Sequence, residues 1–201
     1  MNIINRISVF FSVTFQPLFM PFVGVLLMLL LNDNINDVVP VETRKYIVTI
    51  SLLFTIIIPA ILFLLFFKLG WVSDLNLTVR KERILPTFIV LLLFFVLYYL
   101  VRNAEGINLQ FVSILLGSIV GILIANIVTV FWKISIHSLG VTSVVGSLVA
   151  LFYVTEETLP IAVYIFLGIA IIVGVSRIIL KRHTPMQVVM GSISLTKTDL
   201  I

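Results

Sequence analysis

Long uncharged apolar runs alternate with short polar segments along almost the whole chain. A helix needs about 20 apolar residues to cross the hydrocarbon core of a bilayer, and six runs reach or approach this length. They cover residues 7–31, 46–67, 84–101, 106–132, 134–155 and 158–176. Because backbone polar groups in lipid must be satisfied within their own segment, each run predicts a helix. The expected fold class is all-α: a polytopic membrane helix bundle with about six transmembrane helices and a short C-terminal helix.

Prolines and small residues add detail to this bundle. Pro17, Pro21 and Pro59 fall inside predicted spans, where we expect them to kink the helices. Small residues cluster in the fourth and fifth runs, and there they are typical of close helix packing. These residues are Gly117, Ser118, Gly121, Gly140, Ser143, Gly146 and Ser147.

The composition agrees with a chain whose solvent is mostly lipid. Of 201 residues, 61% are hydrophobic and only 11% are charged, whereas soluble domains carry about 25% charged residues. This leaves no room for a separate soluble domain, so we expect one integral-membrane domain over residues 1–201, and no nucleic-acid partner. The chain has no cysteine, which excludes disulfides, thiolate catalysis and thiolate metal sites.

The loops differ in charge. With six crossings, both termini, the 68–83 loop and the turn at Lys133 lie on one side, which then carries ten lysines and arginines against three on the other. The positive-inside rule favours a cytoplasmic position for the first side, but the same residues also suit a phosphate site, so the orientation stays open. We expect the protein in a bacterial inner (cytoplasmic) membrane. The ten are Arg6, Lys68, Arg80, Lys81, Arg83, Lys133, Arg177, Lys181, Arg182 and Lys197.

The C-terminal segment predicts a new helix after Arg182. Thr184 suits the N-cap, Pro185 the first helical position, and Gln187 the third, which completes a Thr-x-x-Gln capping box. His183 would then lie just outside the positive end of the helix dipole. The apolar stretch that follows is too short to span alone, so it is either a re-entrant helix or a clipped final helix.

The two histidines of the chain, His137 and His183, both lie where an apolar run meets lysine or arginine. Three polar clusters, at 79–86, 133–137 and 176–183, fall on the same predicted side. Arginine offers planar paired donors to phosphate oxygens. One neutral histidine can attack phosphorus, and a second can donate a proton to the leaving oxygen. The clusters therefore favour phosphoryl transfer to a histidine.

The order and spacing of these clusters resemble the type 2 phosphatidic acid phosphatase superfamily over about residues 68–190. Its signature has three blocks: Lys-x6-Arg-Pro, Pro-Ser-Gly-His and Ser-Arg-x5-His-x3-Asp. Residues 176–183 match the third block up to its last position, where Gln187 stands in place of aspartate. Residues 134–137 match the second block at serine and histidine, with Ile136 in place of glycine. Residues 80–86 are a loose equivalent of the first.

The resemblance implies a role for each residue. His183 would be the nucleophile and His137 the general acid, while Gln187 would take the position that orients the nucleophile. The phosphate would be bound by arginine side chains, with a further hydrogen bond from a serine. These phosphate-binding residues are Arg177, Arg80, Arg83 and Ser135.

The same resemblance implies an enzyme that hydrolyses lipid phosphates or diphosphates at the membrane surface. We expect it to act with neither a metal nor another cofactor, and its partners to be the lipid phosphate substrate and the surrounding membrane lipids.

Two other functions remain open. Gln187, Ile136 and the short C-terminal segment suit a degenerate relative that binds anionic lipid headgroups without hydrolysing them. A small transporter component is the other alternative. It is disfavoured, because transporters often place ionisable groups near the bilayer midplane, and every aspartate, glutamate, lysine, arginine and histidine here lies at or outside the edge of a predicted span.

Overall fold

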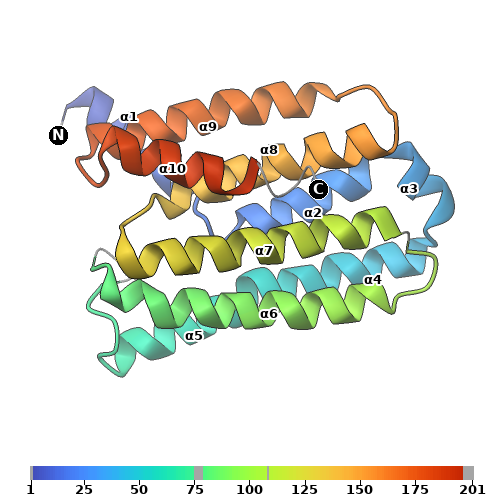
Figure 1. Cartoon of the computed structure of the whole chain (residues 1–201), viewed down its shortest axis with the longest axis horizontal. Helices are drawn as coiled ribbons and strands as arrows, with labels where there is room; N and C mark the ends of the chain where they lie inside the picture. The colour runs from blue at the N-terminus through green and yellow to red at the C-terminus, as the bar shows by residue number, and fades with distance from the viewer. Residues whose placement is uncertain (1, 75–78, 108, 197–201) are drawn as a thin grey trace.

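The computed structural model describes residues 2–74, 79–107 and 109–196, and within these residues it contains helices and no strand. The helices are arranged as a bundle (Figure 1). Their bounds are α1 Ile3–Thr14, α2 Met20–Leu31, α3 Asp33–Val38, α4 Val41–Leu52, the π-turn η1 Leu53–Ile57, α5 Ile58–Lys68, the 3-10 turn η2 Lys81–Arg83, α6 Ile84–Arg102, α7 Leu109–Phe131, α8 Ile136–Val154, α9 Ile161–Ile179 and α10 Pro185–Thr196.

Five helices are long and apolar enough to cross a membrane, which confirms the predicted polytopic bundle and an integral membrane protein. The first of them is formed by α4, η1 and α5 together, and η2 and α6 form the second. The five cover Val41–Lys68, Lys81–Arg102, Phe111–Phe131, Ile136–Val154 and Ile161–Ile179.

The first apolar run differs from its prediction. It does not form one kinked helix over residues 7–31, since α1 ends at Thr14 and α2 begins at Met20. Pro17 and Pro21 interrupt this run, and proline supplies no backbone N–H to continue a helix. The two short helices take different partners: α1 packs on α9, and α2 packs on α8. Hydropathy predicted the apolar length correctly but the continuous helix wrongly.

The predicted kink at Pro59 takes the form of a π-turn. The N–H of Ile58 donates to the carbonyl of Leu53, five residues back, directly before the proline. Because the proline ring excludes the ordinary α-helical bond at its own position, the chain passes through this wider turn. The helix then continues to Lys68.

Helix α8 forms the centre of the bundle, in contact with α2, α7, α9 and α10. Val141, Val144, Leu148 and Leu151 on this helix are fully buried. At Gly140 the linker between α1 and α2 comes so close that a Cβ atom would lie 3.2 Å from Cα of Pro17. The small residue therefore lets the linker lie over the first turns of α8.

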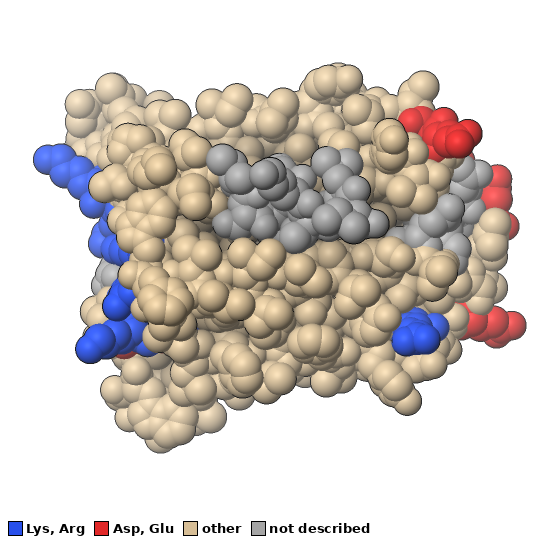
Figure 2. Space-filling model, viewed as in Figure 1, with Lys and Arg blue, Asp and Glu red and all other residues tan. Residues whose placement is uncertain are grey.

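Charge separates the two ends of the bundle. Most of the visible lysine and arginine lies at one end and the aspartate and glutamate at the other (Figure 2). The end of α5, the turn η2, the turn at Lys133 and the turn between α9 and α10 all lie at the first end (Figure 1), as the crossings predicted. We call the end with most of the lysine and arginine the cationic end, and the opposite end the acidic end. Lys197, one of the ten predicted cations, lies outside the described residues.

Candidate active site

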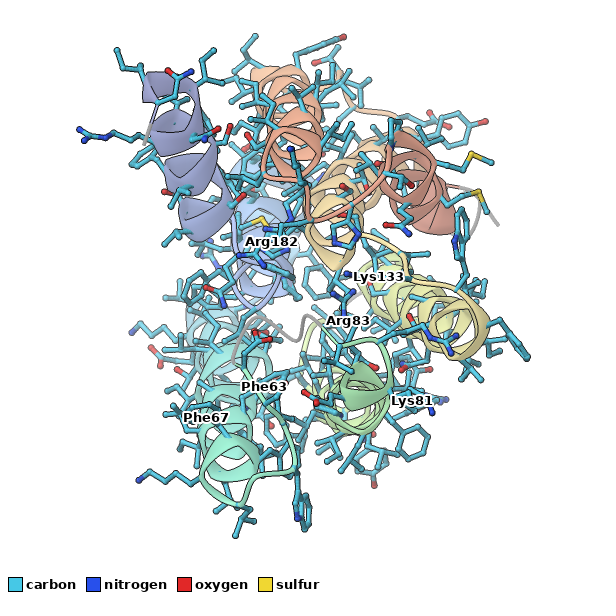
Figure 3. All side chains as sticks on the ribbon, turned by 90° about the vertical axis from the view of Figure 1, so that its left-hand side faces the viewer. Phe63, Phe67, Lys81, Arg83, Lys133 and Arg182 are labelled. Atoms are coloured by element: carbon cyan, nitrogen blue, oxygen red, sulfur yellow. The ribbon has the colours of Figure 1, made fainter. Side chains whose placement is uncertain are left out.

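The three polar clusters meet at the cationic end. Viewed toward this end, Arg83, Lys133 and Arg182 lie around its middle, whereas Lys81 lies at its rim (Figure 3). The residues come from three separate turns: η2 before α6, the turn before α8, and the turn between α9 and α10. Short loops thus bring together side chains that lie up to 99 positions apart in the sequence, from Arg83 to Arg182.

The turn after α9 explains the spacing between Arg177 and His183. The N–H of Arg182 donates to the carbonyl of Arg177 at 3.1 Å, and the N–H of Lys181 donates to that of Ile178 at 2.9 Å. This pair of bonds, with Lys181 in the left-handed region at φ 53°, is a Schellman motif. The N–H of His183 also donates to the Arg177 carbonyl, at 3.3 Å. The chain therefore turns back within the five intervening residues, so that the backbone of His183 lies beside that of Arg177.

The capping box predicted at Thr184 holds the ring of His183. Gln187 Oε1 accepts the backbone N–H of Thr184 at 3.2 Å, and Thr184 Oγ1 accepts the N–H of Gln187 at 3.4 Å. Nδ1 of His183 lies 3.2 Å from the same Oε1. Because the N–H of Thr184 can only donate, the Gln187 atom that faces it is the carbonyl oxygen, so Nδ1 must donate to it as well. This tautomer leaves the lone pair on Nε2.

His183 is held in its neutral form. It is 7% exposed, and burial followed by the charges of Arg177 and Arg83 lowers its pKa to about 4, against an opposing effect of the Gln187 hydrogen bond. At neutral pH the ring therefore carries no proton on Nε2. The pKa of Lys133 is lowered too, first by burial and then by the charges of Arg83, Arg177 and Arg182. Burial is the main cause of both shifts, and the neighbouring positive charges add to it.

His137 reaches the same cavity from the first turn of α8. Ser135 caps this helix: its Oγ accepts the N–H of Ser138 at 3.4 Å and the hydroxyl of Ser138 at 3.0 Å. The backbone of Ser12, close to the end of α1, forms a hydrogen bond with His137. The hydroxyl of Ser135 thus serves as the helix cap, and Ser135 is not among the residues that line the cavity, whereas His137 is.

Helix α10 is docked against the same turn. The N–H of Ser135 donates to the carbonyl of Gln187 at 3.1 Å. Gly191, one turn further along α10, approaches so closely that a Cβ atom would lie 2.6 Å from the carbonyl oxygen of Ser135. The backbone of Gln187 therefore connects α10 to the start of α8, while its side chain holds His183.

The arginines predicted to bind phosphate lie in different places. Arg83 and Arg177, 4% and 9% exposed, line the cavity. Nη1 of Arg83 donates to the carbonyl of Ile134 at 3.2 Å, while Nε of Arg177 is buried without a hydrogen-bond partner among the described residues. Arg80 instead donates to the carbonyl of Val130 at the end of α7 and lies outside the cavity.

The cavity extends from these residues into the bundle. Its volume is about 420 Å³, and its lining is mostly apolar. Along α6 it reaches from Arg83 to Leu97, which at 1.5 Å per residue corresponds to about 21 Å. Exposed Leu64 on α5 also lines it, so one wall reaches the outer surface within a candidate span. The arrangement suits a ligand with an anionic head and a long apolar portion.

Polar residues inside the spans were not predicted as parts of the site. Thr87 on α6 and Asn126 on α7 line the cavity and hydrogen-bond to each other. They lie 39 positions apart, so no local motif connects them. The signal in the sequence was an amide inside a span, five residues before its end at Phe131, since polar groups within spans are costly and often functional.

Within the described parts of the chain, no group of three histidine, cysteine, aspartate or glutamate side chains is placed to hold a metal ion. The cavity is lined by the guanidinium groups of Arg83 and Arg177, which suit an anion, and by the imidazoles of His137 and His183.

Comparison with known proteins supports this description. The family model described as PAP2 superfamily matches residues 129–194, which contain His137, Arg177, His183 and Gln187. The predicted resemblance to that superfamily is thereby confirmed over these residues. Members of the superfamily are generally phosphatases, so the match supports the hydrolysis of a phosphoric ester. Searches among curated proteins and among solved structures gave no match.

Proposed function

We propose that this chain, whose residues 129–194 match the PAP2 superfamily, hydrolyses the phosphate or diphosphate of a membrane lipid through a phosphohistidine on His183. One observation carries the proposal. A neutral imidazole, with Nδ1–H fixed by Gln187, lines the same cavity as Arg177, whose Nε has no hydrogen-bond partner in the part of the chain that the structure describes. This combination provides a nucleophile and an anion-binding group in one place.

The reaction divides into two displacements at phosphorus. The Nε2 lone pair of His183 attacks phosphorus, the bond from phosphorus to the lipid oxygen breaks, and His137, which takes up a proton when the anionic phosphate binds beside it, gives that proton to the oxygen. Arg177 and Arg83 stabilise the negative charge on the equatorial oxygens. Water then attacks the phosphohistidine and gives a proton to neutral His137, the P–N bond breaks, and inorganic phosphate leaves with His183 neutral again.

The apolar extent of the cavity supports a lipid as the substrate. Arg83 and Arg177 line the part of the cavity at the cationic end, and beyond them the walls are formed by apolar side chains from α2, α6, α7 and α8. A water-soluble phosphate ester would leave these walls unused. A lipid phosphate can place its headgroup between the arginines and its hydrocarbon between the helices.

The decisive experiment replaces the nucleophile. In detergent, His183→Ala should lower the release of inorganic phosphate from a lipid phosphate by about 10⁴-fold or more, as for other lost nucleophiles, and should no longer form an acid-labile phosphoprotein. His137→Ala should retain much more activity toward p-nitrophenyl phosphate, whose leaving group needs little protonation, than toward a lipid. Release at the wild-type rate by His183→Ala would contradict the proposal.

Binding without hydrolysis is the second candidate, and Gln187 favours it. An amide oxygen fixes the tautomer of His183 but cannot stabilise an imidazolium as a carboxylate does, and loss of such a carboxylate can cost about 10⁴-fold in rate. Gln187→Glu keeps the side-chain length and the capping box, whereas Gln187→Asp is one methylene shorter. A gain in turnover with Glu indicates an attenuated enzyme. Phosphate-lipid binding without turnover in all three forms indicates a binding protein.

A further inference from the structure

Thr87 and Asn126 form a polar pair inside the membrane-spanning part of the cavity. Both belong to candidate spans, and both line the cavity that holds Arg83, His137, Arg177 and His183. Polar side chains at this depth are expensive to bury in lipid. On the cavity wall they therefore need hydrogen-bond partners, from the protein or from a ligand.

The hydrogen bonds of the pair show what it still offers. Nδ2 of Asn126 donates to the carbonyl of Thr87 at 3.2 Å and to that of Ile122 at 3.0 Å, which uses both of its N–H groups. The Thr87 hydroxyl lies 2.7 Å from the carbonyl of Arg83 and also contacts Oδ1 of Asn126, so its single proton is used as well. Acceptor lone pairs on Thr87 Oγ1 and Asn126 Oδ1 remain.

The position of the pair relates it to a bound headgroup. Thr87 follows Arg83 by four residues, which places it on the same face of the helix and about 6 Å deeper. Phe94 and Leu97 lie a further seven and ten residues along α6 and also line the cavity. From the cationic end inward, the cavity is thus lined first by cations, then by hydrogen-bond acceptors, then by apolar side chains.

We infer that Thr87 and Asn126 select lipid phosphates that carry a free hydroxyl group close to the phosphate. This inference rests on the proposed function and refines its substrate class. A hydroxyl can donate to the unused acceptors, whereas an ester carbonyl cannot, because the N–H groups of Asn126 are already engaged. A lipid whose hydrocarbon begins directly at the phosphate ester oxygen has no donor for these remaining lone pairs, and therefore forgoes about one hydrogen bond.

The test compares two probes with the same chain length, a monoacylglycerol phosphate with its free hydroxyl and a plain alkyl phosphate. The wild-type protein should prefer the hydroxyl-bearing probe by roughly tenfold in kcat/KM, as expected for one buried hydrogen bond. Thr87→Val and Asn126→Leu should each reduce this preference to below about threefold, mainly by slowing the hydroxyl-bearing probe. Ser118→Ala provides a matched control, since Ser118 lines the cavity deeper along α7 and bonds its own helix.

The outcomes distinguish a failure of the hydroxyl preference from a failure of the proposed phosphatase activity. Equal loss on both probes in Thr87→Val and Asn126→Leu would show that the pair only joins α6 to α7, and would overturn the inference. Equal rates on both probes in the wild-type protein would overturn it as well, while leaving the phosphatase activity established. Failure of the wild-type protein to release phosphate from either probe, or from any other lipid phosphate, would instead refute the proposed function.

Discussion

The two ends of the bundle contain similar charged side chains in opposite settings. At the cationic end, Arg83 and Arg177 are buried. At the acidic end, Lys45 and Glu42 form an ion pair of 3.0 Å, but their side chains are 67% and 84% exposed. An exposed pair of this kind contributes about 0–1 kcal/mol, whereas a buried charge is costly unless a partner compensates it. Nε of Arg177 has no hydrogen-bond partner among the described residues, so the difference supports our proposal that this end receives an anion from outside the chain.

The largest effect that tests this comparison is expected at Arg177. Arg177→Met should lower kcat/KM for phosphate release by about 10²- to 10³-fold, because a preorganised donor to the reacting phosphate is lost. Its thermal stability should stay the same or rise, because an apolar side chain replaces a buried charge. The control is Arg102→Met in the last turn of α6, at the acidic end. A fall in stability with unchanged kcat/KM would assign Arg177 to the fold alone.

A second prediction compares two arginines within the cationic end. Arg83→Ala should lower kcat/KM about 10- to 100-fold, because Arg83 lines the cavity and supports the turn at Ile134. Arg80→Ala should change it less than threefold, since its guanidinium contacts the end of α7 instead. Steady-state kinetics on one lipid phosphate measures both. Equal losses would mean that the two arginines act together on the phosphate.

The docking of α10 gives a third prediction. Gly191→Ala should lower the free energy of unfolding by about 1–3 kcal/mol, as expected for overpacking, and lower activity as well, because its Cβ would meet the carbonyl of Ser135. Gly168→Ala is the matched control. Nothing lies within 4 Å of the added Cβ there, so better helix propensity should stabilise it by about 0.5–1 kcal/mol. Thermal unfolding in detergent measures the stability of both variants. A Gly191→Ala protein as stable as the wild type would exclude close packing of Gly191 against Ser135.

The pH dependence should be shallow on the acid side. Because the pKa of His183 is about 4, the nucleophile stays unprotonated as the pH falls from 7 to about 5, and its protonation reduces kcat/KM only nearer pH 4. Gln187→Glu should raise this pKa, since a carboxylate favours the imidazolium, and shift the acid limb to higher pH. If the acid limb of the kcat/KM profile does not shift in Gln187→Glu, a group other than His183 controls that limb.

The smallest effect is expected at the acidic end. Lys45→Ala removes the exposed pair with Glu42 and should change the free energy of unfolding by less than about 0.5 kcal/mol, with unchanged kcat/KM. A large loss of activity in this variant would contradict the division of roles between the two ends.

Local patterns predicted much of this molecule. The length of the apolar runs predicted the bundle, and the Thr184-x-x-Gln187 pattern predicted the start of α10 and the capping box observed there. The first run shows the limit of hydropathy. It measures apolar length but contains no information on how a chain that includes Pro17 and Pro21 pairs with α8 and α9.

The candidate site was less predictable where it depends on contacts between distant segments. The pattern at residues 80–83 places both arginines on one helical face, but only tertiary packing separates Arg83 in the cavity from Arg80 at α7. Likewise, the sequence showed Ser135 beside a histidine, whereas its hydroxyl caps α8. Thr87 and Asn126 meet across two helices and have no common motif.

The turn that carries Arg177 and His183 has a mechanical consequence. Three backbone bonds within residues 177–183 join the arginine to the histidine, so the two move as one piece when α9 tilts. His137 stands on a different helix. Membrane helices adapt to the thickness of the surrounding bilayer by tilting. A change in lipid thickness should therefore preserve the distance between the anion-binding arginine and the nucleophile and alter the distance to the proton donor, so that thickness acts mainly on the departure of the lipid alcohol.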